Sequence, residues 1–158
     1  MRLRIPAWCR HATLRVNGKR VPVKLQRGYA RLSRQWKAGD KIELDLAIPV
    51  ERVYANPRLR YNNGRVALQR GPVVYCLEEV DNGPQLNALA LPVTTKLTTQ
   101  HERAFVSIHG TAVQTTDGME FYQSRQKTKR VRFKAIPYAL WDNRAPDEML
   151  AWLRESVI

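Results

Sequence analysis

Apolar and polar residues alternate in short stretches throughout the first half of the chain. Arg2-Leu3-Arg4-Ile5 and Thr13-Leu14-Arg15-Val16 alternate in this way, and within 41–46 the apolar residues all fall on one face. A period of two residues is typical of a β-strand with one buried and one exposed side. About seven such strands at close spacing, with no helical pattern between them, predict an all-β fold of the sandwich or barrel type.

Two turn signals refine this picture. Asn17-Gly18 follows an alternating stretch and predicts a tight β-hairpin, because both residue types tolerate the positive φ that such turns need. Pro22 lies in the expected return strand and cannot donate a ladder hydrogen bond, which favours an edge position for that strand.

Residues 66–80 join two apolar runs through Gln69-Arg70-Gly71-Pro72. Gly71 can adopt backbone angles closed to other residues and Pro72 fixes its own φ, so a bend or bulge is expected there. Because charge and turn spacing also change at this point, we expect two consecutive antiparallel β-sandwich or jelly-roll-like modules. Residues 1–70 would be the C-terminal part of an incomplete first β-sandwich, and residues 71–158 a second one.

In the second half, further strands are predicted at 93–99, 105–108, 112–114 and 130–135, with a closing strand at 149–153. The polar stretch 115–129 is predicted to be a long exposed loop. Leu86, Leu89 and Leu91 fit either a short helical turn or a strand-like edge.

The formal net charge of +13 is unevenly distributed. Residues 1–72 hold 17 Lys and Arg against four Asp and Glu, while residues 73–158 hold ten of each. Such an excess of positive charge can attract nucleic acid or an acidic surface. The basic stretches 58–61 and 127–130 match no RNA-binding motif, so a face that meets acidic partners is preferred and nucleic acid is not an expected partner.

Cys9 and Cys76 each follow a large aromatic residue and belong to no Cys/His cluster. Two buried free thiols in a reducing compartment are preferred over a disulfide, and no metal site is expected. No apolar run reaches the ~18 residues of a membrane span, so no membrane partner is expected and a cytoplasmic location is predicted.

Candidate catalytic residues are few. Glu78 and Glu79 are adjacent, so on a strand they point to opposite faces and cannot act together on one substrate; an exposed strand end is preferred for this pair. His11, His101 and His109 have no acid or nucleophile at motif spacing. The sequence therefore predicts no catalytic residue.

An aromatic cluster offers a binding site instead. Tyr138, Trp141 and Trp152 lie near Asp142 and Asn143, a mixture that can bind sugars by stacking and hydrogen bonding. Packing in the core is the competing interpretation for the tryptophans.

Several segments carry a family resemblance: 4–8, 16–18, 55–57 and 136–146, Trp36 with Gly39-Asp40, and above all the block 66–78. Together they resemble the C-terminal part of glycoside hydrolase family 127, the bacterial beta-L-arabinofuranosidases and their relatives. The resemblance implies a longer protein with an N-terminal (α/α)6 barrel that carries catalysis, followed by two β-sandwich domains. It also implies zinc in that barrel, held with a Glu-x-Cys element and an adjacent Cys-Cys pair, which Cys9 and Cys76 do not match. Asp147 stands where relatives often have glycine.

We therefore expect a non-catalytic C-terminal accessory region, without a cofactor of its own, that supports the missing catalytic barrel, helps the enzyme to dimerise or walls the sugar pocket. Its expected partners are that barrel, a second copy of the chain and carbohydrate. The alternative is a free-standing carbohydrate-binding module that uses the exposed aromatic residues.

Overall fold

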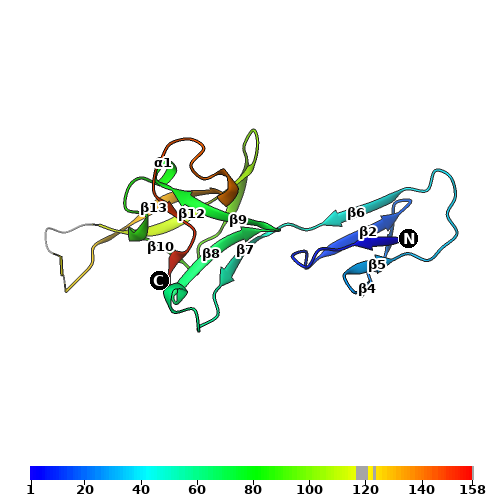
Figure 1. Cartoon of the computed structure of the whole chain (residues 1–158), viewed down its shortest axis with the longest axis horizontal. Helices are drawn as coiled ribbons and strands as arrows, with labels where there is room; N and C mark the ends of the chain where they lie inside the picture. Colours follow the sequence, from blue (N-terminus) through cyan, green and yellow to red (C-terminus); the bar gives the residue numbers. More distant parts are fainter. Residues whose placement is uncertain (117–120, 123, 158) are drawn as a thin grey trace. The chain divides into compact units, whose positions relative to one another are not determined.

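The computed structural model describes residues 1–116, 121–122 and 124–157, and β-strands dominate it, which confirms the all-β prediction. The chain forms two compact units, unit 1 (Met1–Pro49) and unit 2 (Val50–Ile158), which are described separately (Figure 1). The division expected after residue 70 falls instead inside a β-hairpin of unit 2. Within the described residues no helix is long and apolar enough to cross a membrane.

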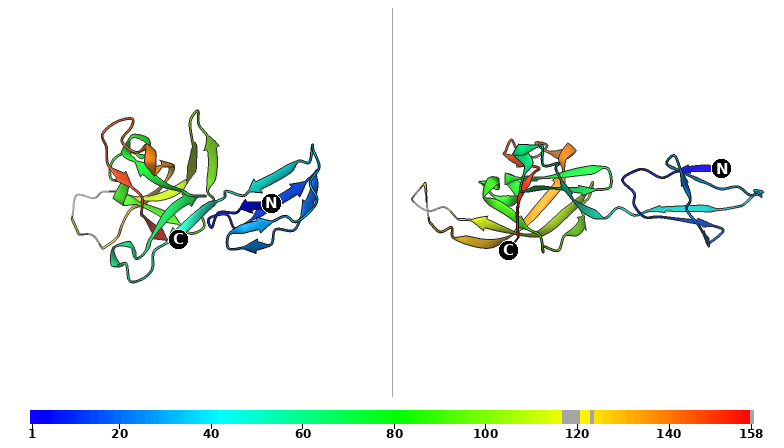
Figure 2. Two further views of the ribbon diagram at one scale, coloured as in Figure 1. Left: turned by 45° about the vertical axis from the view of Figure 1, so that its right-hand side comes forward. Right: turned by 90° about the horizontal axis from the view of Figure 1, so that it is seen from below.

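Unit 1 contains two antiparallel sheets of three strands each, drawn in blue and cyan in Figure 2. One sheet has the order β1 (Arg2–Arg4), β5 (Tyr29–Arg31), β4 (Leu25–Gln26), and the other β3 (Lys19–Val21), β2 (Ala12–Val16), β6 (Ile42–Leu46). The alternating stretches supply a common core from both sheets: Leu14 and Ala30 are buried, with Leu3 and Leu44 packed against them. Burial of one face of each strand is what the period of two predicts.

The hairpin predicted at Asn17-Gly18 is confirmed. Both residues have positive φ, 51° and 75°, and β2 pairs with β3 on either side of them. The Asn17 side chain also donates to the Asp40 carboxylate at 2.8 Å and accepts the Lys41 backbone N–H at 2.8 Å, which ties the turn to the start of β6. The return strand β3 is an edge strand, as expected, but it ends at Val21, directly before Pro22.

Unit 2 is built on a closed ring of six strands in the order β9, β13, β12, β10, β15, β8 and back to β9. Their bounds are β8 Arg65–Arg70, β9 Val73–Glu78, β10 Leu89–Pro92, β12 Val106–Thr115, β13 Thr128–Pro137 and β15 Leu153–Ser156. Strand β15 closes the ring by pairing antiparallel with β8 and parallel with β10. Closure removes the exposed edges that an open sheet would present.

The prediction of sandwich or jelly-roll-like modules is therefore wrong, because unit 2 is a β-barrel. The Gly71-Pro72 pivot is a tight turn in which Gly71 has φ 59°, and it folds β9 back onto β8. What was interpreted as a seam between modules is a hairpin inside one sheet. Gly71 permits the turn, and Pro72 has no N–H to leave unpaired there.

Further strands and short helices of unit 2 lie outside the six-stranded ring. They are β7 (Val50–Tyr54), η1 (Arg60–Asn62), α1 (Glu79–Asn82), η2 (Leu86–Ala88), β11 (Thr98–His101), η3 (Tyr138–Leu140) and β14 (Met149–Leu150). The strand predicted at 93–99 covers mostly the turn between β10 and β11, and the closing strand predicted at 149–153 is two strands, β14 and β15. The loop predicted at 115–129 lies partly outside the described residues, namely at 117–120 and 123.

The barrel core is aliphatic and aromatic, and a glycine makes room for the ring of Phe133. Buried side chains from every strand of the ring meet there, including Leu68, Leu77, Leu91, Ile108 and Phe133. Gly110 lies opposite Phe133 in the ladder. A Cβ at Gly110 would lie 2.7 Å from Cε1 of that ring and 3.0 Å from Cγ2 of Thr95.

We predict that Gly110→Ala destabilises unit 2 by about 1–3 kcal/mol, because the added methyl overpacks a buried ring that cannot swing away. The cost exceeds the ~0.5–1 kcal/mol that alanine normally gains over glycine in a strand. Urea denaturation followed by circular dichroism measures the difference. Thr99→Ala on the exposed strand β11 is the matched control and should change stability by less than about 0.5 kcal/mol; a Gly110→Ala protein as stable as wild type contradicts the packing argument.

Candidate functional site

The predicted sugar-binding residues lie where β13 ends and the chain turns through η3 toward β14. Tyr138 and Trp141 come together there, with ring centroids 6.4 Å apart. Asp142 and Asn143 follow directly and are exposed, and Asp142 has positive φ (62°). Trp152 is half-buried between β14 and β15, where its carbonyl accepts a hydrogen bond from Arg65 at 3.0 Å.

The two rings form a corner and not a flat platform. Tyr138 is 45% and Trp141 39% exposed, but their planes are inclined by 39°. A sugar ring stacks best on a face presented flat to it. The geometry therefore offers one ring face at a time, and the binding role of these residues stays a prediction.

Glu78, which closes β9, is the best-defined polar group beside this corner. It is 1% exposed, so the expectation of an exposed strand end is wrong for this residue. Its Oε1 accepts the backbone N–H of Asp142 at 3.0 Å, and its Oε2 accepts a hydrogen bond from Arg144. A buried carboxylate requires such partners, since an unpaired charge in the interior is costly.

Arg144 links Glu78 to a second carboxylate. Its Nη1 and Nη2 donate to the two oxygens of Asp81 at 3.1 and 2.6 Å, in the bidentate geometry that suits a guanidinium. These hydrogen bonds with Asp81, followed by those with Glu78, raise the Arg144 pKa. The arginine therefore stays charged and pins the loop that follows η3 to the end of β9 and to α1.

The network continues along the barrel. Lys134 lies 3.7 Å from the Asp81 carboxylate and 3.5 Å from the Glu102 carboxylate. Asn82 donates to the carbonyls of Glu78 and Lys134 at 2.8 and 2.9 Å and accepts the Lys134 N–H at 2.9 Å. Most of these polar side chains form hydrogen bonds or ion pairs with other groups of the protein, which is typical of a structural network.

Ser107, His109 and Glu102 have the composition of a catalytic triad but not its arrangement. The Ser107 hydroxyl contacts both the Glu102 carboxylate (2.9 Å) and Nε2 of His109 (2.8 Å). Its hydrogen bond lowers the Glu102 pKa, so that carboxylate is ionised and accepts the serine proton. The serine proton is therefore directed to Glu102 and not to His109, and Ser107 itself is fully buried.

The zinc that the resemblance implies finds no fitting ligands here. Cys9 and Cys76 are free and buried, one in each unit. In the described part of the chain, no group of three or more His, Cys, Asp or Glu could hold a metal ion. Burial first, and then the Glu78 charge, raise the Cys76 pKa to about 12, so this thiol is protonated and unsuited to ligation or nucleophilic attack.

Two family models match the chain almost end to end. The Beta-L-arabinofuranosidase, GH127 middle domain covers residues 1–48, and the Glycoside hydrolase family 127 C-terminal domain covers residues 50–154. The chain belongs to glycoside hydrolase family 127. The two matches follow the division into units 1 and 2 at residue 49.

Relatives agree with this assignment. A curated relative, the non-reducing end beta-L-arabinofuranosidase of Bifidobacterium longum subsp. longum, is 48% identical over 83 residues, which is 51% of this chain and 12% of that protein. The crystal structure of a GH127 beta-L-arabinofuranosidase from Geobacillus stearothermophilus T6 is 44% identical with a TM-score of 0.93, over 98% of this chain and 26% of that one. A GH127 beta-arabinofuranosidase structure is 29% identical with a TM-score of 0.88, over 99% of this chain and 28% of that one. The family 127 chain described here thus spans about a quarter of the length of these solved relatives.

Sequence reasoning missed the pairing of Glu78 with Arg144. The two residues are far apart in the chain, and no local pattern connects them. A signal was nevertheless present, because Glu78 ends one of the blocks that resemble the family and Arg144 lies in another. Asp147, noted as unusual, accepts the Val80 backbone N–H at 2.7 Å and so contributes to the same junction.

We predict that Arg144→Met lowers the free energy of unfolding by about 2 kcal/mol, because it leaves the Glu78 carboxylate buried without its cation. Adding Glu78→Gln removes that charge, so the double variant should be more stable than Arg144→Met alone. Urea titrations of the four proteins of this double-mutant cycle measure the coupling. Arg103→Met, at an exposed site, is the control; a double variant weaker than both single variants contradicts the buried-charge argument.

We predict that the Cys76 thiol makes the free energy of unfolding depend on pH. Its pKa rises from 9.0 to about 12 on folding, so the unfolded chain releases this proton at lower pH than the folded chain. The contribution is complete below pH 9.0 and is lost as pH rises toward about 12. The free energy of unfolding should therefore fall more steeply above pH 9.0 for wild type than for Cys76→Ala, by up to ~1.4 kcal/mol per pH unit. Equal slopes for the two proteins would show that folding does not raise the Cys76 pKa.

Proposed function

We propose that this chain is a non-catalytic accessory region of a beta-L-arabinofuranosidase-like glycoside hydrolase, which supports the catalytic barrel, the assembly of the enzyme, or both. The agreement between units 1 and 2 and the middle and C-terminal domain models carries the proposal. On this proposal the catalytic residues and their zinc belong to the part of the family's length that this chain does not span, and the substrate is an L-arabinofuranoside.

The chemistry of the described residues supports this role. Glu78 and Ser107, the polar groups that could suggest catalysis, are buried and occupied in structural hydrogen bonds. In most families of glycoside hydrolases, hydrolysis uses two carboxyl groups that flank an accessible bond, and buried, occupied groups cannot take that role. Two buried free cysteines are consistent with a reducing, cytoplasmic compartment, which is part of the same proposal.

A second candidate function is sugar binding by the corner formed by Tyr138 and Trp141. Its support is the partial exposure and proximity of the two rings. On this alternative the corner holds a saccharide against one ring face, with Asp142 or Asn143 hydrogen-bonding to it.

The test replaces the equivalent segment of the Geobacillus stearothermophilus relative with this chain and compares the chimera with the same enzyme truncated before that segment. We expect the chimera to be folded and active on p-nitrophenyl beta-L-arabinofuranoside, and the truncated enzyme to lose stability and most activity, because the exposed barrel surface loses its cover. The chain alone should release no p-nitrophenol.

Two variants of the chimera distinguish the accessory role from sugar binding. Arg144→Met should lower its melting temperature with little change in KM, because it weakens the accessory region and not a substrate contact. Trp141→Ala should leave KM unchanged if the region is structural, whereas a raised KM at unchanged stability supports sugar binding. Hydrolysis by the chain alone, or a truncated enzyme as stable and active as the intact one, overturns the proposal.

A further inference from the structure

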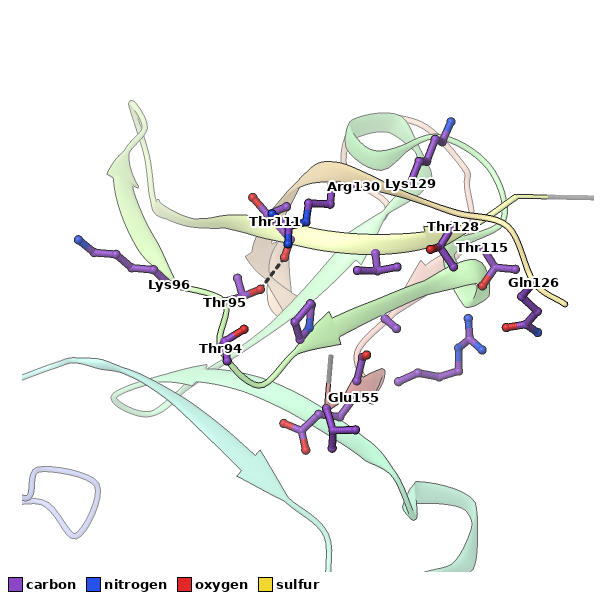
Figure 3. Close-up of a pocket in the computed structure, with 16 residues that line it drawn as sticks. Thr94, Thr95, Lys96, Thr111, Thr115, Gln126, Thr128, Lys129, Arg130 and Glu155 are labelled. Carbon is purple, nitrogen blue, oxygen red and sulfur yellow. Dashed lines mark hydrogen bonds between the residues drawn. The ribbon is translucent and has the colours of Figure 1, made fainter.

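The outer surface of the barrel is hollowed into a cleft of about 970 Å³ beside β10, β12, β13 and β15 (Figure 3). Leu91, Ile108 and Phe133 on these strands point into the core. Pro92, Thr111 and Arg130 lie an odd number of residues from them along the same strands, so they point outward into the cleft. The turn between β10 and β11, with Thr94 and Thr95, forms one wall. The volume lies in the range of about 300–1,000 Å³ that is usual for small-molecule sites.

The charges that line this cleft are mostly positive. Arg130 and Arg154 contribute two cations and Glu155 a carboxylate, while Lys96 and Lys129 border the cleft with side chains that point away from it in Figure 3. That carboxylate is already engaged, since its Oε1 accepts hydrogen bonds from Arg52 at 3.3 Å and from the Tyr54 hydroxyl at 2.7 Å. A concave surface lined by one sign of charge focuses the field and attracts ions of the opposite sign.

Arg154 shows that the hydrogen-bonding capacity of the cleft is not exhausted. It donates from Nη2 to the Ala88 carbonyl at 3.1 Å, but its buried Nε has no acceptor among the described residues. Among the described residues, no ion pair or hydrogen bond occupies the side chain of Arg130. Both arginines therefore have donors available to an anionic ligand.

Hydroxyl groups line the same surface. Thr94, Thr111, Thr115 and Thr128 add their hydroxyls, and Thr95 donates from Oγ1 to the Thr111 carbonyl at 2.7 Å, as the dashed line in Figure 3 shows. A threonine hydroxyl can both donate and accept, which suits a ligand with many hydroxyls of its own. Apolar walls from Ala90 and Val113 fit the C–H faces of such a ligand.

None of the described residues that line the cleft carries an aromatic ring. Neutral sugars and nucleobases are usually held by stacking on aromatic faces, so neither suits this cleft. We propose that the cleft binds carboxylate-bearing oligosaccharides, with the basic side chains pairing with the uronate carboxylates and the threonines hydrogen-bonding to ring hydroxyls. This site is separate from the Tyr138–Trp141 corner, and its proposal goes beyond the accessory role and does not depend on it.

The experiment is a calorimetric and NMR titration of the intact chain with tetragalacturonate and with its fully methyl-esterified counterpart. The ester keeps the ring hydroxyls and removes the charge. We expect saturable binding of the acid, at least about tenfold weaker binding of the ester, and chemical-shift changes on β12 and β13. Equal binding of acid and ester overturns the proposed charge recognition.

Two charge-matched variants locate the site. Arg130→Gln/Arg154→Gln should weaken binding of the acid by about tenfold or more. Arg15→Gln/Arg20→Gln removes the same charge from an exposed cross-strand pair in unit 1 and should leave binding nearly unchanged. Equal losses in both variants, or equally tight binding of a single-stranded oligonucleotide of the same charge, would indicate attraction to the basic chain as a whole and would refute the site. Because the titration uses this chain alone, its outcome is independent of the chimera experiment.

Discussion

The backbone hydrogen bonds of β8 hold unit 2 together, because this strand pairs with β7, β9 and β15 and so lies at the point where the ring closes. Val66 and Leu68 on it are fully buried, and Gly64, just before it, accepts the Glu155 N–H at 2.8 Å. If β15 left β8, two strand edges and the core between them would be exposed. The barrel, its core and the outer cleft therefore form one cooperative structure.

Beyond the ring, a buried ion pair helps to attach the long connection between β13 and β14. Glu78 lies at the end of a core strand, and Arg144 and the Asp142 N–H reach it from that connection. A buried carboxylate of this kind adds little net stability compared with an apolar pair, but a connection placed wrongly would leave it unpaired. The salt bridge between Glu78 and Arg144 therefore helps to position the aromatic corner, although neither ring takes part in it.

The parts of the fold that could be predicted from sequence are those encoded by neighbouring residues. Alternation gave the strands of unit 1, and Asn17-Gly18 gave their hairpin, because turn conformation depends on the residues in the turn. Barrel closure could not be predicted, since Ala90 and Arg154 pair in parallel without any local signal. The burial of Glu78 was missed for the same reason, because its partner Arg144 is distant in sequence. Tyr138 and Trp141 were correctly grouped as near neighbours, but a sequence carries no information on the angle between their rings.

The parallel pairing of β15 with β10 has a consequence for synthesis. Strands β8 to β13 emerge from the ribosome as consecutive segments, yet their ring lacks a side until residues 153–156 have also emerged. Until then, the unpaired edges of β8 and β10 face each other across a gap, in the kind of intermediate that binds chaperones or aggregates. Completion of the barrel therefore waits for β15, and pairing between strands so distant in sequence makes that step slow.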